Sequence, residues 1–168
     1  MMQTTVRTSK ESIMRIAQVA PLSESVPPKL YGGTERNVHY LTEELLRQEH
    51  KVTLFASGDS RTGADLRPSV PRALRLGPDA ANVLVSHLVM LEQVFRNASE
   101  FDIIHFHLDY LHFPYVRRER VPHVTTLHNR LDIPGFAPVY REYIELPLVS
   151  ISNAQRAPLC HGLIGRLR

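Results

Sequence analysis

Residues 13–19 read IMRIAQV and residues 31–36 read YGGTER, and these two stretches decide the fold. The first stretch is an apolar run typical of a buried strand, and apolar residues at helical spacing follow the second from Val38 onward. A glycine pair at a strand-to-helix turn lets the backbone approach a ligand, and the helix that follows offers free N–H groups to an anion. The loop between them, residues 20–31, exceeds the ~2–6 residues usual for such a connection. Its length favours a binding loop over a plain link.

Strand and helix patterns alternate along the rest of the chain. Helical spacing of apolar residues predicts helices over 34–48 and 81–95. Further apolar runs predict strands at 51–56, 73–76 (a short edge strand), 101–106, 121–127 and 148–152. Residues 57–72 are expected to form a turn and loop because Pro68 and Pro71 interrupt them. The alternation predicts a single doubly wound, Rossmann-like α/β domain with a parallel sheet and helices on both faces.

Length and composition bound the function. The 168 residues suit one domain, predicted over 13–160 between a flexible N-terminal extension at 1–12 and a tail at 161–168. The net charge is only +3, with no sustained basic stripe, which argues against nucleic-acid binding. One cysteine, Cys160, cannot form an internal disulfide framework and fits a reducing compartment, so we expect a cytoplasmic protein. No stretch approaches the ~20 apolar residues of a transmembrane segment.

Polar residues follow the predicted strands where those strands end. The residues concerned are Gly32, Gly33, His107, Asp109, His128, Asn129 and Ser152. In an open parallel sheet, ligands bind beyond the carboxyl ends of the strands, where the strand order reverses. A single histidine is more often structural, but polar groups from several strands at one edge indicate a binding site.

Five segments together resemble a known family. They are residues 14–21 (MRIAQVAP), 31–36 (YGGTER), 54–60 (LFASGDS), 102–107 (DIIHFH) and 126–128 (TLH), in that order. They resemble the N-terminal domain of the retaining, two-Rossmann-domain (GT-B type) glycosyltransferases, the family of sucrose synthase and the phosphatidylinositol mannosyltransferases. The resemblance runs from Met14 to about Leu159. It implies the acceptor-side half of an enzyme that moves a hexose from a nucleoside-diphosphate sugar to a hydroxyl acceptor with retention.

The resemblance also implies roles for individual residues. The histidine matching His128 lies near the transferred sugar and is the catalytic candidate. The residues expected to bind donor or acceptor are Gly32, Gly33, Glu35, His107, Asp109, Asn129 and Ser152. The loops at 20–31 and 57–72 are expected to shape acceptor preference. No cofactor or metal is implied beyond the nucleotide sugar itself, which serves as co-substrate.

The chain departs from the family pattern in two respects. Glu49 stands where members often carry a glycine just past the first helix, at a natural left-handed cap position. Asn129 replaces a glycine or aspartate, a mild change because asparagine tolerates a positive φ. The family also binds most of the donor with a second Rossmann domain, which residues 161–168 do not supply. We therefore expect residues 1–168 alone to be inactive, with a missing C-terminal domain or a homo-oligomer as the partner.

Two alternatives remain open from the sequence. His105, His107 and Asp109 have the H-x-H-x-D spacing of zinc-dependent hydrolases, with His112 and His128 as further possible ligands. Against this, Tyr110 stands where that motif needs another histidine, and the strand–helix alternation is wrong for such a fold. The second alternative is a non-catalytic, flavodoxin-like binding domain that would use the same glycine turn for a phosphate.

Overall fold

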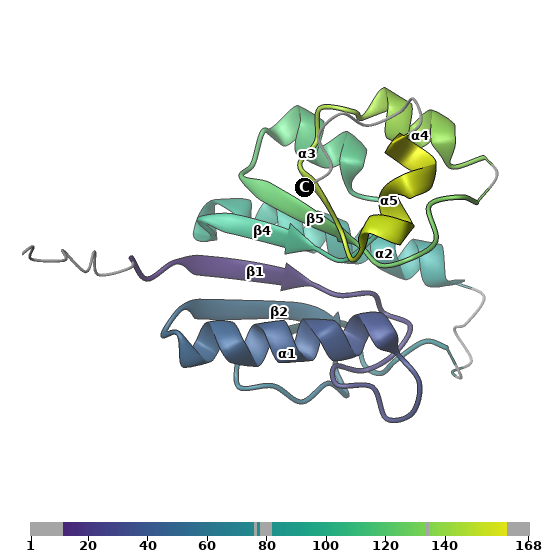
Figure 1. The fold of residues 1–168 in the computed structure, drawn as a ribbon. Helices are drawn as coiled ribbons and strands as arrows, with labels where there is room; N and C mark the ends of the chain where they lie inside the picture. Colours follow the sequence, from purple (N-terminus) through teal and green to yellow (C-terminus); the bar gives the residue numbers. More distant parts are fainter. Residues whose placement is uncertain (1–11, 76, 78–81, 134, 161–168) are drawn as a thin grey trace, which may run out of the picture.

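The computed structural model describes residues 12–75, 77, 82–133 and 135–160, and within them the chain forms one parallel sheet (Figure 1). The strands, in chain order, are β1 (Arg15–Val19), β2 (Lys51–Ser57), β3 (Asp65–Val70), β4 (Ile103–Phe106), β5 (His123–Leu127) and β6 (Leu148–Ser150). Their order in the sheet is β3-β2-β1-β4-β5-β6, and every neighbouring pair is parallel. The predicted fold class is confirmed. The predicted extension, apart from Ser12, and the tail at 161–168 lie outside the described residues.

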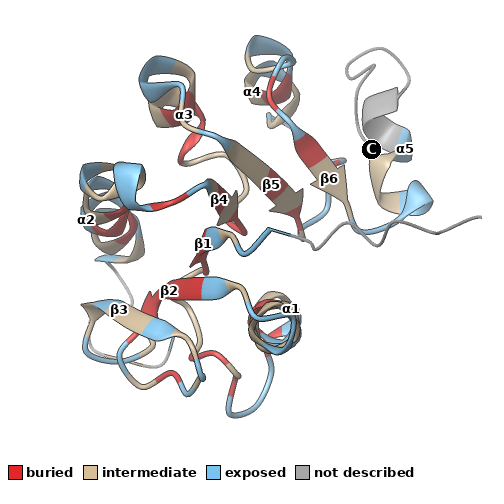
Figure 2. Ribbon diagram, turned by 90° about the vertical axis from the view of Figure 1, so that its left-hand side faces the viewer, coloured by how far each residue is buried: buried red, intermediate tan, exposed pale blue. Residues whose placement is uncertain are grey.

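Helices cover both faces of the sheet. They are α1 (Gly33–Arg47), α2 (Val83–Arg96), α3 (Phe113–Glu119), α4 (Ala137–Glu142) and α5 (Asn153–Cys160), with a 3₁₀ turn, η2, at Ala98–Glu100. Figure 2 shows α2, α3 and α4 on one face and α1 and α5 on the other. No helix in the described part of the chain combines the length and the apolar character needed to cross a bilayer.

The two faces of the sheet bury different side chains because successive strand residues point to opposite sides. The larger apolar cluster joins Phe55 and Phe106 of the sheet to Met90 and Leu91 of α2. A smaller cluster on the α1 face contains Val38 and Leu54. In β4 the alternation sends Ile104 and Phe106 to the larger cluster, so His105 and His107 lie on the α1 face. This part of the interior is polar, and it leads to the carboxyl edge.

The edge of the sheet differs from the prediction. The prediction of a strand at 73–76 is wrong, because residues 73–75 form no strand. Residue 76 lies outside the described part. At this edge lies β3, within the segment expected to be a loop, and Pro68 of β3 pairs with Ala56 of β2. Proline is tolerated there because an edge strand needs ladder hydrogen bonds on one side only. The short helices α3 and α4, each with a proline in its first turn, are additions to the predicted pattern.

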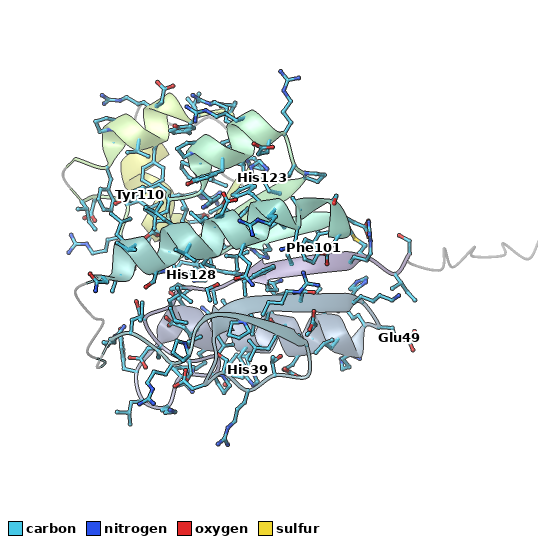
Figure 3. The ribbon with its side chains drawn as sticks, turned by 180° about the vertical axis from the view of Figure 1, so that it is seen from behind. His39, Glu49, Phe101, Tyr110, His123 and His128 are labelled. Carbon is cyan, nitrogen blue, oxygen red and sulfur yellow. The ribbon has the colours of Figure 1, made fainter. Side chains whose placement is uncertain are left out.

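The end of α1 confirms the left-handed position inferred for Glu49. The Glu49 N–H donates to Leu46 O at 2.9 Å, and the His50 N–H donates to Leu45 O at 3.1 Å. This pair of bonds is a Schellman motif, which normally places glycine at the position that Glu49 occupies. Glu49 has φ 65°. Figure 3 shows it at the opposite end of the molecule from Tyr110.

Candidate functional site

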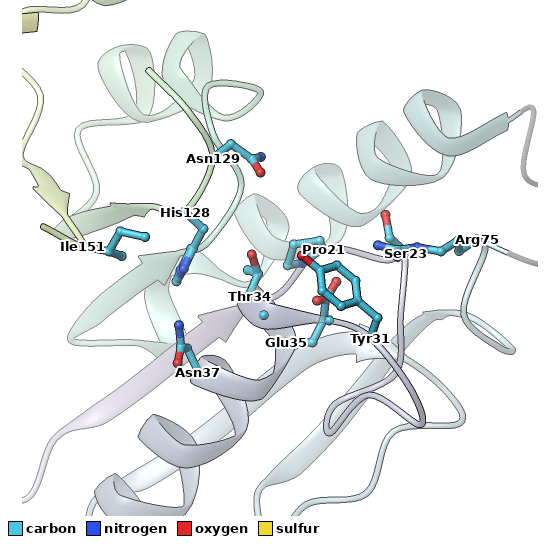
Figure 4. Close-up of a pocket in the computed structure, with 12 residues that line it drawn as sticks. Pro21, Ser23, Tyr31, Thr34, Glu35, Asn37, Arg75, His128, Asn129 and Ile151 are labelled. Carbon is cyan, nitrogen blue, oxygen red and sulfur yellow. The ribbon is translucent and has the colours of Figure 1, made fainter. Parts of the chain in front are cut away.

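A cavity of about 310 Å³ lies at the carboxyl edge of the sheet, beside the point where the strand order reverses between β1 and β4. Its lining comes from the loop after β1, the start of α1, the loop before α2, and the ends of β5 and β6. The lining residues are Pro21, Ser23, Tyr31, Gly32, Gly33, Thr34, Glu35, Asn37, Arg75, His128, Asn129 and Ile151 (Figure 4). The structure thus brings Gly33 and His128, predicted from segments far apart in sequence, to one cavity.

The two glycines of the turn have different roles. Gly32 caps α1, and a Cβ there would lie 2.7 Å from Cβ of Pro28 and 2.9 Å from a carboxylate oxygen of Glu35. The close packing of Pro28 therefore requires glycine at position 32. A Cβ at Gly33 would meet no atom within 4 Å, so nothing in the fold requires glycine there. Because a helix leaves its first N–H groups unpaired, Gly33 and Thr34 offer theirs to the cavity.

The loop at 20–31 is fixed by contacts with two other segments. The Leu22 N–H donates to Nε2 of His87 on α2 at 3.2 Å, and the Val26 N–H donates to the Ser60 hydroxyl at 2.9 Å. On the cavity side, the Arg75 guanidinium pairs with Glu24 at 3.0 Å and lies 5.9 Å from the centre of the Tyr31 ring. These contacts hold the loop in place as one wall of the cavity.

Glu35 is 3% exposed, in the first turn of α1. Burial raises the pKa of its carboxyl above the ordinary value, and hydrogen bonds from the backbone N–H groups of Glu35 and Glu24 oppose that rise. The carboxylate therefore ties the loop to the helix start. This geometry makes Glu35 part of the cavity wall.

Three side chains form a hydrogen-bonded chain across neighbouring strands on the α1 face. Nδ1 of His107 lies 2.9 Å from Nε2 of His128, and Nε2 of His107 lies 2.7 Å from the carboxamide oxygen of Gln18. Burial lowers the pKa of both histidines, and for His107 it does so strongly. Both rings are therefore neutral near pH 7.

The geometry does not support the zinc alternative. His105 binds the Thr126 hydroxyl at 2.8 Å, while both ring nitrogens of His107 are engaged by Gln18 and His128. His112 lies in the core, bound to the Thr125 hydroxyl at 2.7 Å. Among the residues described, no three His, Cys, Asp or Glu side chains converge as ligands of one metal ion.

A second cavity of about 230 Å³ adjoins the first, and the two share lining residues such as Ser23, Thr34 and Asn129. His107 and Asp109 line it, and the Asn129 amide donates to the Asp109 carboxylate at 2.6 Å. Burial raises the pKa of Asp109, and the hydrogen bond from Asn129 partly opposes that rise. The rings of Tyr110 and Phe136 meet edge to face in its wall, 5.1 Å apart.

The predicted site residues fall into two groups. Gly32, Gly33, Glu35, His107, Asp109, His128 and Asn129 all line one or both of these cavities. Ser152 does not. Its hydroxyl instead accepts the Gln155 N–H at 3.0 Å and caps α5.

The sequence did not predict several residues in or next to the site, and three of them are instructive: Asn37, Gln18 and Arg75. Asn37 lies one helical turn after Gly33 and faces His128 in Figure 4, so helical spacing could have found it. Gln18 is a polar residue within the apolar run of β1, and this break in the pattern could have marked it as a candidate. Arg75 could not be found in this way, because its position depends on the path of the loop after β3.

A protein-family model described as Glycosyltransferase Family 4 matches residues 31–160. No curated protein sequence matches the chain. Among solved structures, AviGT4, a glycosyltransferase involved in avilamycin A biosynthesis, is 24% identical with a TM-score of 0.56, and the match covers 92% of this chain and 40% of that one. Sucrose-phosphate synthase from Thermosynechococcus elongatus is 15% identical with a TM-score of 0.59, and the match covers 92% and 47%.

HepE from Anabaena, solved in complex with UDP-glucose, is 14% identical with a TM-score of 0.55, and the match covers 88% of this chain and 40% of HepE. At these identities the likenesses establish the fold alone. The chain spans less than half the length of each of these three structures.

Proposed function

The chain belongs to glycosyltransferase family 4, and we propose that it is the acceptor-side half of an enzyme that moves a hexose from a nucleoside-diphosphate sugar to a hydroxyl acceptor with retention. In this reaction the bond between sugar C1 and the diphosphate oxygen breaks, and a bond forms between C1 and the acceptor oxygen. The acceptor proton leaves with the diphosphate. The proposal that the configuration at C1 is retained rests on the resemblance of the sequence motifs to those of the retaining enzymes.

The observation that supports this proposal is the cavity where the start of α1 meets His128. The N–H groups of Gly33 and Thr34 suit a diphosphate, since a helix N-terminus favours negative charge. The absence of a side chain at Gly33 leaves room for phosphate oxygens to approach the backbone. His128, across the cavity, is then our candidate for the catalytic residue beside the transferred sugar.

The second cavity suits the acceptor. Asp109 can accept a hydrogen bond from a hydroxyl group, and Asn129 holds its carboxylate in place. Because the two cavities share lining residues, an acceptor hydroxyl there would lie next to a donor bound at α1. Glu35 contributes by holding the loop that lines the donor cavity.

We propose that a second, donor-binding unit completes the site, either a further domain or another polypeptide. A helix N-terminus contributes only about 0.3–1 kcal/mol toward a charge in exposed settings. Nanomolar binding requires about −12 kcal/mol, so this cavity alone cannot hold a nucleotide sugar tightly. Residues 1–168 alone should therefore show no measurable transfer. The single cysteine of the chain favours the cytoplasm as its location.

The catalytic proposal is tested by His128→Ala in a two-domain version of the protein. If His128 acts mainly in the transition state, kcat should fall by at least about tenfold while KM changes little. The matched control is His123→Ala, because His123 begins the strand that His128 follows, at the opposite edge of the sheet. This control should leave kcat unchanged. Equal effects of the two substitutions would contradict the assignment.

The remaining alternative, a non-catalytic binding domain, gives a different result in the same experiment. Such a protein would bind a nucleotide sugar in its two-domain form without transferring the hexose. Product analysis by NMR separates the outcomes, because the coupling constant of the new anomeric proton also reports whether configuration is retained.

A further inference from the structure

Gln18 lies in β1, and His107 and His128 directly follow the neighbouring strands β4 and β5. Hydrogen bonds join the three side chains in a row. Gln18 is 0% exposed and His107 is 4% exposed, so the hydrogen bond between them is buried, and the bond from His107 to His128 is partly buried. His128 alone of the three lines the 310 Å³ cavity. The chain of bonds therefore runs from the core of the sheet to the site.

The hydrogen-bond chain has a direction. The carboxamide oxygen of Gln18 can only accept, so Nε2 of His107 must carry a hydrogen. Because burial keeps His107 neutral, its Nδ1 carries none and can only accept. Nε2 of His128 must then be the donor in the bond to His107. A neutral His128 with hydrogen on Nε2 has a bare Nδ1.

Gln18 is a poor choice for stability alone. Its amide nitrogen is buried without a hydrogen-bond partner in the described structure, which costs stability. An apolar side chain of similar length, such as methionine, would avoid that cost in the centre of the sheet. A buried polar group that lowers stability and leads to a cavity is expected where it serves the site.

We propose that Gln18 is a positioning residue that acts through His107 to fix the tautomer of His128, with hydrogen on Nε2 and none on Nδ1. Nδ1 is then the nitrogen left for a ligand, and it accepts a hydrogen bond from a sugar hydroxyl. A lone pair there also suits the positive charge that develops on the transferred sugar. This consequence for catalysis rests on the proposed function, whereas the tautomer itself does not.

The tautomer is measured on the ¹⁵N-labelled chain through long-range ¹H–¹⁵N spectra of the imidazole rings near pH 7.5. The expected result is a single His128 tautomer with hydrogen on Nε2. In Gln18→Met, His107 loses its fixed partner, and the His128 nitrogen shifts should move toward the average of both tautomers. The control is Thr125→Val, which breaks the His112 hydrogen bond on the opposite face and should leave the His128 shifts unchanged.

The proposal that Gln18 fixes the His128 tautomer through His107 (the relay) is overturned by either of two results. One is a His128 that carries its hydrogen on Nδ1 in the unsubstituted chain. The other is a Gln18→Met variant in which the nitrogen shifts of His128 do not move. The spectrum of the unsubstituted chain tests the direction by itself, so the proposal stays testable if the variant does not fold. In a two-domain version, Gln18→Met should lower kcat about tenfold, with KM little changed. A confirmed tautomer with unchanged kcat would refute the role proposed for His128 and leave the relay standing.

Discussion

Glu49 is held in a conformation that suits glycine. Its φ of 65° lies in the left-handed region, which costs an ordinary residue roughly 1–2 kcal/mol. Its negative charge also lies at the carboxyl end of α1, where the helix dipole favours cations. The resemblance to the family marks this position as one where glycine is common, and the backbone gives the physical reason.

We predict that Glu49→Gly raises the free energy of unfolding by about 1 kcal/mol, because relief of the left-handed strain exceeds the added entropy of the unfolded chain. Urea unfolding followed by circular dichroism measures the difference. The matched control is Gln48→Gly, one residue earlier, where φ is −83° and nothing requires glycine. That substitution should lower the stability by about 0.5–1 kcal/mol. Equal effects of the two substitutions would show that strain at Glu49 is not the cause.

At the scale of elements, the sequence predicted β1, β2, β4, β5 and β6 and missed β3, at one edge of the sheet. β1, β2, β4, β5 and β6 are apolar runs because helices cover both sides of the sheet. β3 contains Asp65, Arg67 and Pro68, since an edge strand faces solvent on one side, and that composition predicts a loop. The position of β3 is fixed by pairing with β2, a tertiary effect that local sequence does not carry.

The site was predictable to the extent that it depends on strand ends. Parallel strands bring their carboxyl ends to one edge, so Gly33, His128 and Asn129 could be grouped from sequence alone. A side chain that reaches the site from a loop, such as that of Arg75, could not be placed there from the sequence. Ser152 also follows a strand, but its hydroxyl caps α5 and it lines neither of the two cavities, so its role in ligand binding stays a prediction.

The start of α1 allows the two glycines to be separated by experiment. Gly32→Ala should lower the free energy of unfolding by about 1–3 kcal/mol, because the new methyl group overlaps Pro28. Gly33→Ala should leave it unchanged or raise it by up to about 1 kcal/mol, since alanine is the better helix former and its methyl group meets open space. Chemical unfolding of both variants checks this. A larger loss for Gly33→Ala would mean that the turn, not a ligand, requires that glycine.

For the whole molecule, the buried histidines predict acid sensitivity. Burial lowers the pKa of His87, His105 (to about 4), His107, His112, His123 and His128. Below about pH 6.5 these histidines therefore bind protons in the unfolded chain, while in the folded chain they stay neutral. Their contribution to stability is complete above that pH and is lost progressively as pH falls below it.

His107 and His112, the most deeply buried, together imply a loss of about 3 kcal/mol per pH unit below pH 6. Glu35 and Asp109 have raised pKa values and act in the opposite direction, but they are fewer. Urea unfolding at pH 7.5, 6.0 and 5.0 should show a steep decline. A constant free energy of unfolding over this range would contradict the burial of neutral histidines.

The central claim is that the cavity between the start of α1 and His128 binds the nucleotide sugar. A titration of the ¹⁵N-labelled chain with UDP-glucose and other nucleoside-diphosphate sugars, followed by ¹H–¹⁵N spectra, tests it most directly. We predict weak, saturable shifts at Gly33, Thr34 and His128 with a Kd near the millimolar range, which corresponds to about −4 kcal/mol. In the Gly33→Ala variant, the same titration should produce no shifts at these residues. Tight stoichiometric binding, shifts confined to another surface, or no shift at these residues with any sugar nucleotide would contradict the claim.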